Sequence, residues 1–138
     1  MADDQNKVLA DFRAYTDAFN SLKPSAIAAH YHEPCLLVVP PGVFSLASKA
    51  EVERVFSDFL RDLVSRGFVR CAYEGLQATM LSGSDAMVSG ICVRLDGNGG
   101  VLERFGHTCT LRRNKEQWRI AVNAIHEPDR VLHLRDPA

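Results

Sequence analysis

Apolar side chains recur at three- and four-residue steps in two parts of the chain, and this period predicts two amphipathic helices. The apolar stripe of the first runs over residues 8–22, and Asp3 or Asp4 is placed to cap its start. This helix ends before Pro24, because the residue that precedes a proline is pushed out of helical geometry. The second opens at the capping box Ser48–Glu51 and ends at Gly67, which suits a left-handed C-cap. A short helix over residues 26–31 is expected between the two.

The remaining apolar residues follow the pattern of strands. The run over residues 35–39 is too short for a helix and rich in β-branched residues, so it predicts a buried strand, with a short returning strand over 43–46. Three clusters of turn-forming residues then divide the second half of the chain into four strands. The expected bounds of these strands are 68–81, 86–95, 101–113 and 118–127.

Helices followed by a series of long antiparallel strands are typical of an α+β fold. A chain of 138 residues is long enough for one domain, which is expected to cover residues 1–138. The sheet has to curve to cover the helices, and Gly75, Gly90 and Gly106 are the candidate positions for its kinks.

Side chains alternate between the two faces of a strand, so strand pairing decides which polar residues face the core. For the last hairpin, a two-residue and a four-residue loop give the same register, in which Leu111 lies opposite Ile120. Continued along both strands, this register sets His107 opposite Ala124 and turns His126 to the same face. Both histidines are then expected on the core face, diagonal to one another.

The preceding hairpin favours a register that sets Ser89 opposite His107 and Val93 opposite Glu103, so that Glu103 also points inward. A slip of one residue would instead turn Ser89 and Val93 away from the core, and the strand that contains Tyr73 fits either orientation. Polar groups without partners in a dry core cost about 1–3 kcal/mol each, whereas a concave and partly wet pocket removes this cost. The pattern therefore predicts a pocket whose polar groups are His107, His126, Glu103 and Ser89.

Charge and composition exclude several kinds of partner. The chain carries 16 basic and 17 acidic side chains and a formal net charge of −1, without the basic surface of a nucleic-acid binder. It has no uninterrupted apolar window of about 18 residues, so no membrane partner is expected either. The chain starts with polar residues rather than a signal peptide, and its cysteines form no Cys-x-x-Cys pair. We therefore expect a cytoplasmic protein with four free, buried thiols: Cys35, Cys71, Cys92 and Cys109.

No metal or cofactor is expected. His30 and His32 have the spacing of a ligand pair on a strand, but they lie at the end of a predicted helix, where side chains two residues apart diverge. The glycine-rich segment 97–100 joins two strands and is not followed by a helix, which disfavours a phosphate-binding loop.

Four short strings occur in order along nearly the whole chain: Asp11–Tyr15 with Phe19, Ala28–Pro34, Pro41–Phe44 and Trp118–Ala121. Their order and spacing resemble the nuclear transport factor 2-like superfamily, which includes SnoaL-like polyketide cyclases, ketosteroid isomerases and scytalone dehydratase. The resemblance implies a cone: a curved, mostly antiparallel sheet wrapped around three helices, also called a cystatin-like α+β roll. It further implies an apolar cavity for a small hydrophobic ligand and a homodimer formed through the outer face of the sheet.

The catalytic residues of ketosteroid isomerases do not carry over to this chain. Their base carboxylate sits just before the Pro-Gly turn after the first strand, where this chain has Val39 or Pro40. Their oxyanion-side acid lies on the strand before the final hairpin, where this chain offers Thr108 or Thr110. Because that mechanism needs both acidic groups, it is not expected here.

Three hypotheses for the function stay open. In the first, the pocket catalyses an isomerase-, dehydratase- or cyclase-like reaction on a small hydrophobic ligand, with His107 as the general acid or base. His126 would be its partner, in loose likeness to the histidine pair of scytalone dehydratase. Tyr15, at a pocket-lining position of the family, or Tyr31 would donate a hydrogen bond, and Glu103 would be an orienting acceptor.

The second hypothesis keeps the pocket without the chemistry, and the protein binds such a ligand. The third is a dimerisation module, whose partner is a second copy of the chain. In both pocket hypotheses the residues expected to contact the ligand are Phe12, Phe19, Tyr31, Phe56, Phe59, Ser89, Ile91, Phe105 and Val122.

Overall fold

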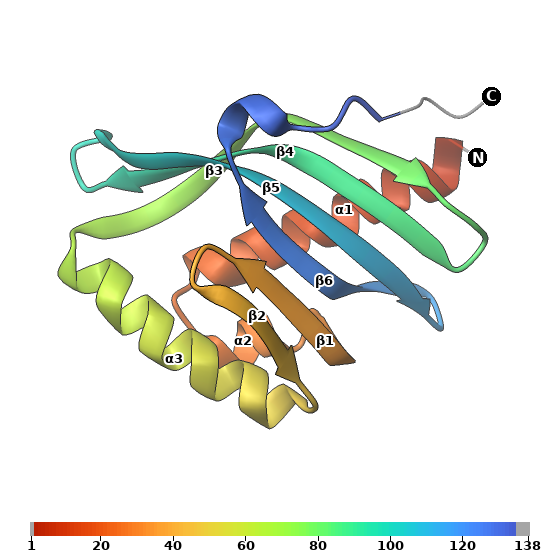
Figure 1. Ribbon diagram of the computed structural model, residues 1–138, viewed down its shortest axis with the longest axis horizontal. Helices are drawn as coiled ribbons and strands as arrows, with labels where there is room; N and C mark the ends of the chain where they lie inside the picture. Colours follow the sequence, from red (N-terminus) through yellow and green to blue (C-terminus); the bar gives the residue numbers. More distant parts are fainter. Residues whose placement is uncertain (1, 135–138) are drawn as a thin grey trace.

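Six strands form one sheet, and three helices lie along it (Figure 1). The computed structural model describes residues 2–134, so Met1 and residues 135–138 of the predicted domain lie outside the described residues. The strand order is β2-β1-β6-β5-β4-β3, and all neighbours are antiparallel except β1 and β6. The elements are α1 (Ala2–Asn20), α2 (Pro24–Ala28), β1 (Tyr31–Val39), β2 (Gly42–Leu46), α3 (Lys49–Ser65), β3 (Phe68–Met80), β4 (Asp85–Asp96), β5 (Val101–Asn114), β6 (Gln117–His126) and a 3-10 turn (Pro128–Arg130).

Local signals predicted both long helices. At the start of α3 the backbone N–H of Glu51 donates to Ser48 Oγ at 3.3 Å, and Ser48 N–H donates back to Glu51 Oε2 at 3.2 Å, which is the predicted capping box. Gly67, with a φ of 94°, follows the helix in the left-handed region, as predicted. Within residues 2–134 there is no helix with the length and apolar character needed to cross a membrane.

The segment between the two long helices is where the predicted elements are wrong. The helix expected over residues 26–31 is the shorter α2, and the strand expected over 35–39 already begins at Tyr31. Tyr31 pairs in parallel with Ile120 of β6, whose backbone N–H donates to the carbonyl of His30 at 2.9 Å. Pairing with a strand far along the chain therefore overrides the local helical pattern.

The sheet curves around the helices and gives the α+β cone that the resemblance implied. Gly75 has a φ of 64°, and the β3–β4 pairing shifts between Glu74 and Gln77, so that a bulge lies at this predicted kink. In Figure 1, α1 runs across the sheet and α3 lies below it, on the side of β1 and β2. Phe12 of α1 and Leu63 of α3 are almost completely buried in the core between these layers.

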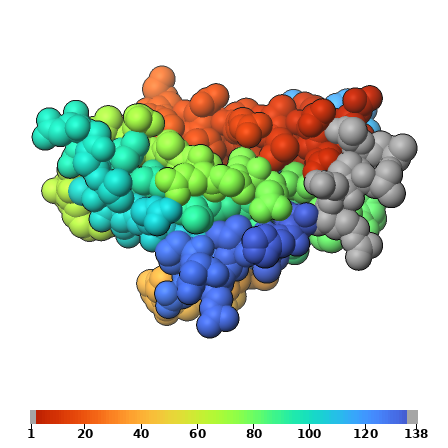
Figure 2. Space-filling view, turned by 90° about the horizontal axis from the view of Figure 1, so that it is seen from above, coloured from red at the N-terminus to blue at the C-terminus, as the bar shows by residue number. Residues whose placement is uncertain are grey.

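The outer face of the sheet is partly covered by residues 127–134. The backbone N–H of Leu132 donates to Ser89 Oγ at 3.1 Å, and that of Leu134 donates to Gln77 Oε1 at 3.2 Å. Figure 2 shows this blue segment lying against the green and teal strands. Ser89 is therefore completely buried, although it faces away from the core.

A substitution at Gly106 tests how tightly the start of the segment 127–134 packs against the outer face of the sheet. A Cβ atom there would overlap the ring of His126 and lie 2.6 Å from the backbone oxygen of Glu127. We expect Gly106→Ala to lower the free energy of unfolding by about 1–3 kcal/mol, as overpacking does. Gly83→Ala is the matched control, because nothing lies within 4 Å of a Cβ at Gly83. Urea denaturation measures both, and equal midpoints for the two variants would contradict the packing described.

Candidate functional site

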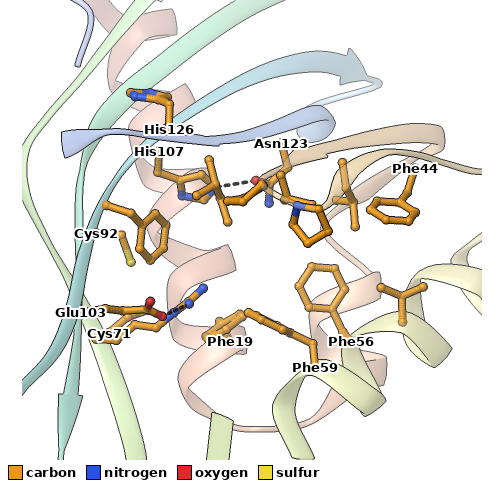
Figure 3. A pocket seen from close by; sticks show the side chains of 18 of the residues that line it. Phe19, Phe44, Phe56, Phe59, Cys71, Cys92, Glu103, His107, Asn123 and His126 are labelled. Atoms are coloured by element: carbon orange, nitrogen blue, oxygen red, sulfur yellow. Dashed lines mark hydrogen bonds and ion pairs between the residues drawn. The ribbon is translucent and has the colours of Figure 1, made fainter. Parts of the chain in front are cut away.

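A cavity of about 910 Å³ lies between the helices and the inner face of the sheet (Figure 3). Phe19 of α1 and the α3 residues Phe56 and Phe59 form one wall, and side chains of β3 to β6 form the opposite wall. Val43 and Phe44 of the β1–β2 hairpin border the cavity while 66% and 46% exposed, so this hairpin lies where the cavity opens to solvent. The volume is within the usual range for small-molecule sites, about 300–1,000 Å³.

The register of β4 and β5 differs from the prediction by one residue along most of its length. The predicted register holds at Leu95 and Val101, next to the turn, and then shifts. Arg94 therefore lies opposite Glu103, and Gly90 rather than Ser89 lies opposite His107. As a result Ser89 and Val93 leave the inner face and Arg94 joins it.

The last hairpin shows the same kind of shift. Leu111 lies opposite Ile120 as predicted, but Thr110 lies opposite Val122, so Ala121 is an extra residue in a bulge. Beyond the bulge, alternate side chains of β6 exchange faces. Asn123 turns inward, and His126 turns outward, which corrects the prediction that His126 shares the core face with His107.

A chain of hydrogen bonds joins polar side chains from five elements beside the cavity. Tyr73 Oη of β3 lies 2.7 Å from His107 Nδ1 of β5, and His107 Nε2 lies 2.8 Å from Asn123 Oδ1 of β6. Asn123 Nδ2 donates to Tyr31 Oη of β1 at 2.7 Å, and Tyr31 Oη lies 3.1 Å from Tyr15 Oη of α1. Burial raises the pKa of Tyr15, Tyr31 and Tyr73, so all three phenols stay protonated.

The donors and acceptors in this chain determine the tautomer of His107. The Asn123 amide nitrogen donates to Tyr31, so the Asn123 oxygen faces His107 and accepts from Nε2–H. Burial lowers the pKa of His107 to about 4, so that the ring is neutral at pH 7 and Nδ1 accepts from the Tyr73 hydroxyl. Both ring nitrogens are thus occupied by protein groups.

Arg94 is the second polar feature of the cavity wall. Its side chain is only about 8% exposed, its guanidinium carbon lies 4.4 Å from the ring centre of Phe105 and 5.0 Å from that of Phe59, and Nη1 donates to the carboxylate of Glu103. Its Nε is the one buried side-chain nitrogen or oxygen without a hydrogen-bond partner among residues 2–134. A guanidinium has five N–H donors, so Arg94 has donors to offer to a ligand.

The structure brings most of the predicted site residues to the cavity. Those that line it are Tyr15, Phe19, Phe56, Phe59, Glu103, Phe105 and His107. His126 borders it too, but its ring is directed away from the cavity in Figure 3, with Nε2 2.7 Å from Thr108 Oγ1 and Nδ1 2.8 Å from the Glu127 oxygen. The functional roles assigned to all these residues stay predictions.

Five predicted contact residues lie outside the cavity lining, for two reasons. Phe12 and Tyr31 lie behind the lining, where Phe12 packs 5.8 Å from the His107 ring and Tyr31 bonds to Asn123. Ser89, Ile91 and Val122 are on the outer face, because of the shifts in register. Within residues 2–134, no group of three or more His, Cys, Asp or Glu side chains is arranged to hold a metal ion.

Sequence reasoning missed the residues that complete the polar wall. Arg94 lies between Val93 and Leu95, and Asn123 lies between Val122 and Ala124, and a polar residue within such an apolar run is the signal that could have identified them. The predicted register of the last hairpin placed Asn123 on the outer face, which was wrong, because the bulge at Ala121 turns it inward. Tyr73, whose orientation the sequence left open, faces the cavity together with Cys71 and Cys92.

The low pKa of His107 predicts a pH-dependent stability. As the pH falls from about 6.5, the ordinary pKa of histidine, to 4, the unfolded chain takes up a proton that the folded chain excludes. The His107 contribution is therefore complete above pH 6.5, and its loss by pH 4 lowers the free energy of unfolding by about 3 kcal/mol. Urea titrations between pH 4 and 7.5 should show this fall in the wild type and not in His107→Gln. His133→Gln, at an exposed position, should keep the wild-type pH dependence, and an equal slope in all three proteins would refute the assignment.

Several solved structures share this fold at low sequence identity. An NTF2-like protein with a cystatin-like fold from Novosphingobium aromaticivorans has a TM-score of 0.73 and 18% identity, over 94% of this chain and 84% of that chain. A ketosteroid isomerase-like protein from Erwinia carotovora atroseptica has a TM-score of 0.70 and 20% identity, over 91% and 97% of the two chains. A protein of unknown function with a cystatin-like fold from Nostoc punctiforme has a TM-score of 0.73 and 11% identity, over 91% and 92%.

A family assignment comes from the sequence itself. No curated protein matches the chain. The model of the family described as NTF2-like protein (DUF6841) matches residues 4–128, which is most of the chain. The chain therefore belongs to this NTF2-like family, in agreement with the resemblance found in its sequence.

Proposed function

We propose that the protein binds a small, largely apolar molecule in the cavity and holds it through one neutral hydrogen-bond acceptor, such as a carbonyl oxygen. The observation that carries this proposal is Arg94, a buried arginine that lines the cavity within an aromatic wall and pairs with Glu103 through Nη1. The terminal N–H groups of its guanidinium that this ion pair does not use can donate to a ligand oxygen in the cavity.

The apolar character of the ligand follows from the rest of the wall. Phe19, Phe56 and Phe59 present aromatic surface from the helices, and Leu37 and Val39 add aliphatic surface from β1. His107 lies in the opposite wall, but its nitrogens are already hydrogen-bonded to Tyr73 and Asn123, so it adds little polarity. Contact with a ligand would therefore be mostly apolar, with orientation set by one polar point.

The preference for a neutral acceptor follows from Glu103. Its carboxylate already pairs with Arg94, so an anionic ligand would bring a second negative charge next to the first. A carbonyl oxygen accepts a hydrogen bond from the guanidinium without that repulsion. Arg104, which also borders the cavity, is paired with Glu74 and half exposed, and is a weaker recognition point.

Three naphthalene probes test this proposal: 2-acetylnaphthalene, the hydrocarbon 2-ethylnaphthalene and the anion 2-naphthoate. We expect the ketone to bind about tenfold more tightly than the hydrocarbon, since a hydrogen bond to a charged donor contributes about 1.5–3 kcal/mol, and naphthoate to bind more weakly than the ketone. Arg94→Met should remove the advantage of the ketone, and the matched control Arg104→Met should keep it. Isothermal titration calorimetry measures these affinities. Equal binding of ketone and hydrocarbon to the wild type would overturn the proposal.

Acid–base catalysis is the second candidate, and the contact between Tyr73 and His107 favours it. Tyr73 lines the cavity, and its hydroxyl donates to His107 Nδ1. A proton taken from a substrate carbon by the Tyr73 oxygen could be balanced by transfer of the Tyr73 proton to Nδ1, with Asn123 accepting from the resulting imidazolium. The pKa of His107, about 4, makes it a weak base, so this function ranks below binding.

Proton exchange tests the second candidate. If the relay operates, the methyl protons of 2-acetylnaphthalene should exchange with deuterium oxide faster in the presence of the protein than in buffer. The enzymatic rate should be constant above pH 5 and fall as the pH decreases through 4, because only neutral His107 accepts the proton. NMR follows the exchange, and Tyr73→Phe should return it to the buffer rate. Exchange at the buffer rate in the wild type would exclude this chemistry for the probe.

Two expectations from the sequence stay predictions. One is a homodimer through the outer face of the sheet, which would use the part of that face that residues 127–134 leave uncovered. The other is a cytoplasmic location, which suits the four free cysteines.

A further inference from the structure

Two of the four cysteines lie together in the cavity wall. Tyr73 of β3 lies opposite Cys92 of β4, and Cys71 lies opposite Arg94, so Cys71 and Cys92 are diagonal neighbours on the inner face. Both border the cavity, and Figure 3 shows them on the wall that β3 and β4 form. Cys35 and Cys109 are also buried but lie outside the cavity lining.

The surroundings of the two sulfur atoms are different. The Cys71 thiol donates to Asn20 Oδ1, with Sγ at 3.4 Å, and the same oxygen accepts from the Cys71 backbone N–H at 2.8 Å. Asn20 therefore favours the protonated form of Cys71. Cys92 instead lies opposite Tyr73, and Arg94, two residues after Cys92 in β4, is on the same face of the sheet.

This difference assigns the roles of nucleophile and second thiol. The positive charge of Arg94, on the same face of β4, favours the thiolate form of Cys92, whereas the hydrogen bond to Asn20 favours the protonated form of Cys71. Burial and the carboxylate of Glu103 act against the Cys92 thiolate. Cys92 is thus the more reactive thiol, and Cys71 is the neighbour that can resolve its oxidised form.

We propose that Cys71 and Cys92 form a two-cysteine site that is oxidised by hydroperoxides, and that apolar organic hydroperoxides are the class the cavity admits best. The chemistry of this site depends on the two thiols and their spacing, and it shares only the charge of Arg94 with the ligand recognition proposed above. The aromatic walls favour a hydroperoxide with an apolar group over hydrogen peroxide, since the apolar group is removed from water on entry.

The reaction balances without another reagent. The Cys92 thiolate attacks the terminal oxygen of the hydroperoxide, the O–O bond breaks, and the alkoxide leaves and takes up a proton as an alcohol. The resulting Cys92 sulfenic acid is attacked by Cys71, an S–S bond forms, and water leaves with the hydroxyl group and the Cys71 proton. Two thiols and one hydroperoxide thus give one disulfide, one alcohol and one water.

The position of the pair predicts that this disulfide is easily reduced. Cα atoms of diagonal neighbours on adjacent strands are about 7–8 Å apart, beyond the usual range of about 4.4–6.8 Å in disulfides. Formation of the bond therefore requires the backbones of β3 and β4 to move closer together, and the resulting strained disulfide would be readily reducible. A small dithiol should restore both cysteines.

The experiment treats the reduced full-length protein with one equivalent of cumene hydroperoxide or of hydrogen peroxide. We expect the mass to fall by two hydrogens, a disulfide between Cys71 and Cys92 in peptide mapping, reversal by dithiothreitol, and a reaction at least about fivefold faster with cumene hydroperoxide. Cys71→Ser should stop at a sulfenic acid on Cys92 that dimedone labels, and Cys92→Ser should lose both products. Cys35→Ser is the control and should behave like the wild type.

Peptide mapping of the wild type keeps the test decisive even where a variant folds poorly. Four intact thiols after treatment, a disulfide that involves Cys35 or Cys109, or dimedone labelling of Cys71 instead of Cys92 would each overturn the proposal. Equal rates for the two hydroperoxides would overturn the preference for apolar oxidants. None of these outcomes changes the result of the naphthalene titrations, so failure of one proposal is distinguishable from failure of the other.

Discussion

Polar side chains inside an apolar cone are stable when their hydrogen-bonding groups have partners, and among residues 2–134 every buried side-chain nitrogen and oxygen except Arg94 Nε meets this condition. The chain from Tyr73 to Tyr15 meets it with one group from each of five elements. Asn123 is its centre, because one amide accepts from His107 and donates to Tyr31. Without that amide, His107 Nε2 would keep only the weak contact with Cys109 Sγ at 3.3 Å, and Tyr31 Oη would keep only Tyr15 as a partner. A buried donor or acceptor that loses its partner costs about 1–3 kcal/mol. The chain therefore holds α1, β1, β3, β5 and β6 in one arrangement beside the cavity.

Asn123 reaches its partners only because Ala121 is an extra residue in β6. Both hairpin registers predicted from the sequence hold beside their turns, where loop residues limit the pairing, and both shift further along the strands. A turn has a recognisable composition, whereas a bulge accepts many residue types. For this reason the sequence predicted the bounds of the four long strands closely but placed Ser89 and His126 on the wrong face.

The same distinction separates what could be predicted of the site. Phe19, Phe56 and Phe59 follow a helical stripe, and an amphipathic helix has only one face to bury, so their positions in the cavity wall could be predicted. The face of the sheet that a strand residue occupies depends on alternation along the strand, and one bulge reverses that alternation. Arg94 and Asn123 were missed for that reason. The early start of β1 was missed for a different reason: β1 pairs with β6, and the two segments are far apart in the sequence.

The ion pair of Arg94 and Glu103 is unusual within an aromatic wall. Taking a charge out of water costs several kcal/mol, and this cost falls mainly on Arg94, whose side chain is 8% exposed compared with 38% for Glu103. Apolar residues of similar volume often stabilise a core equally well or better. Phe59 and Phe105 offset part of this cost by packing on the guanidinium, but they leave its edge unsatisfied. Stability alone therefore does not account for Arg94. A buried guanidinium with N–H groups beyond those that pair with Glu103 fits the proposed role of Arg94 in ligand recognition, and the same charge also favours the thiolate of Cys92.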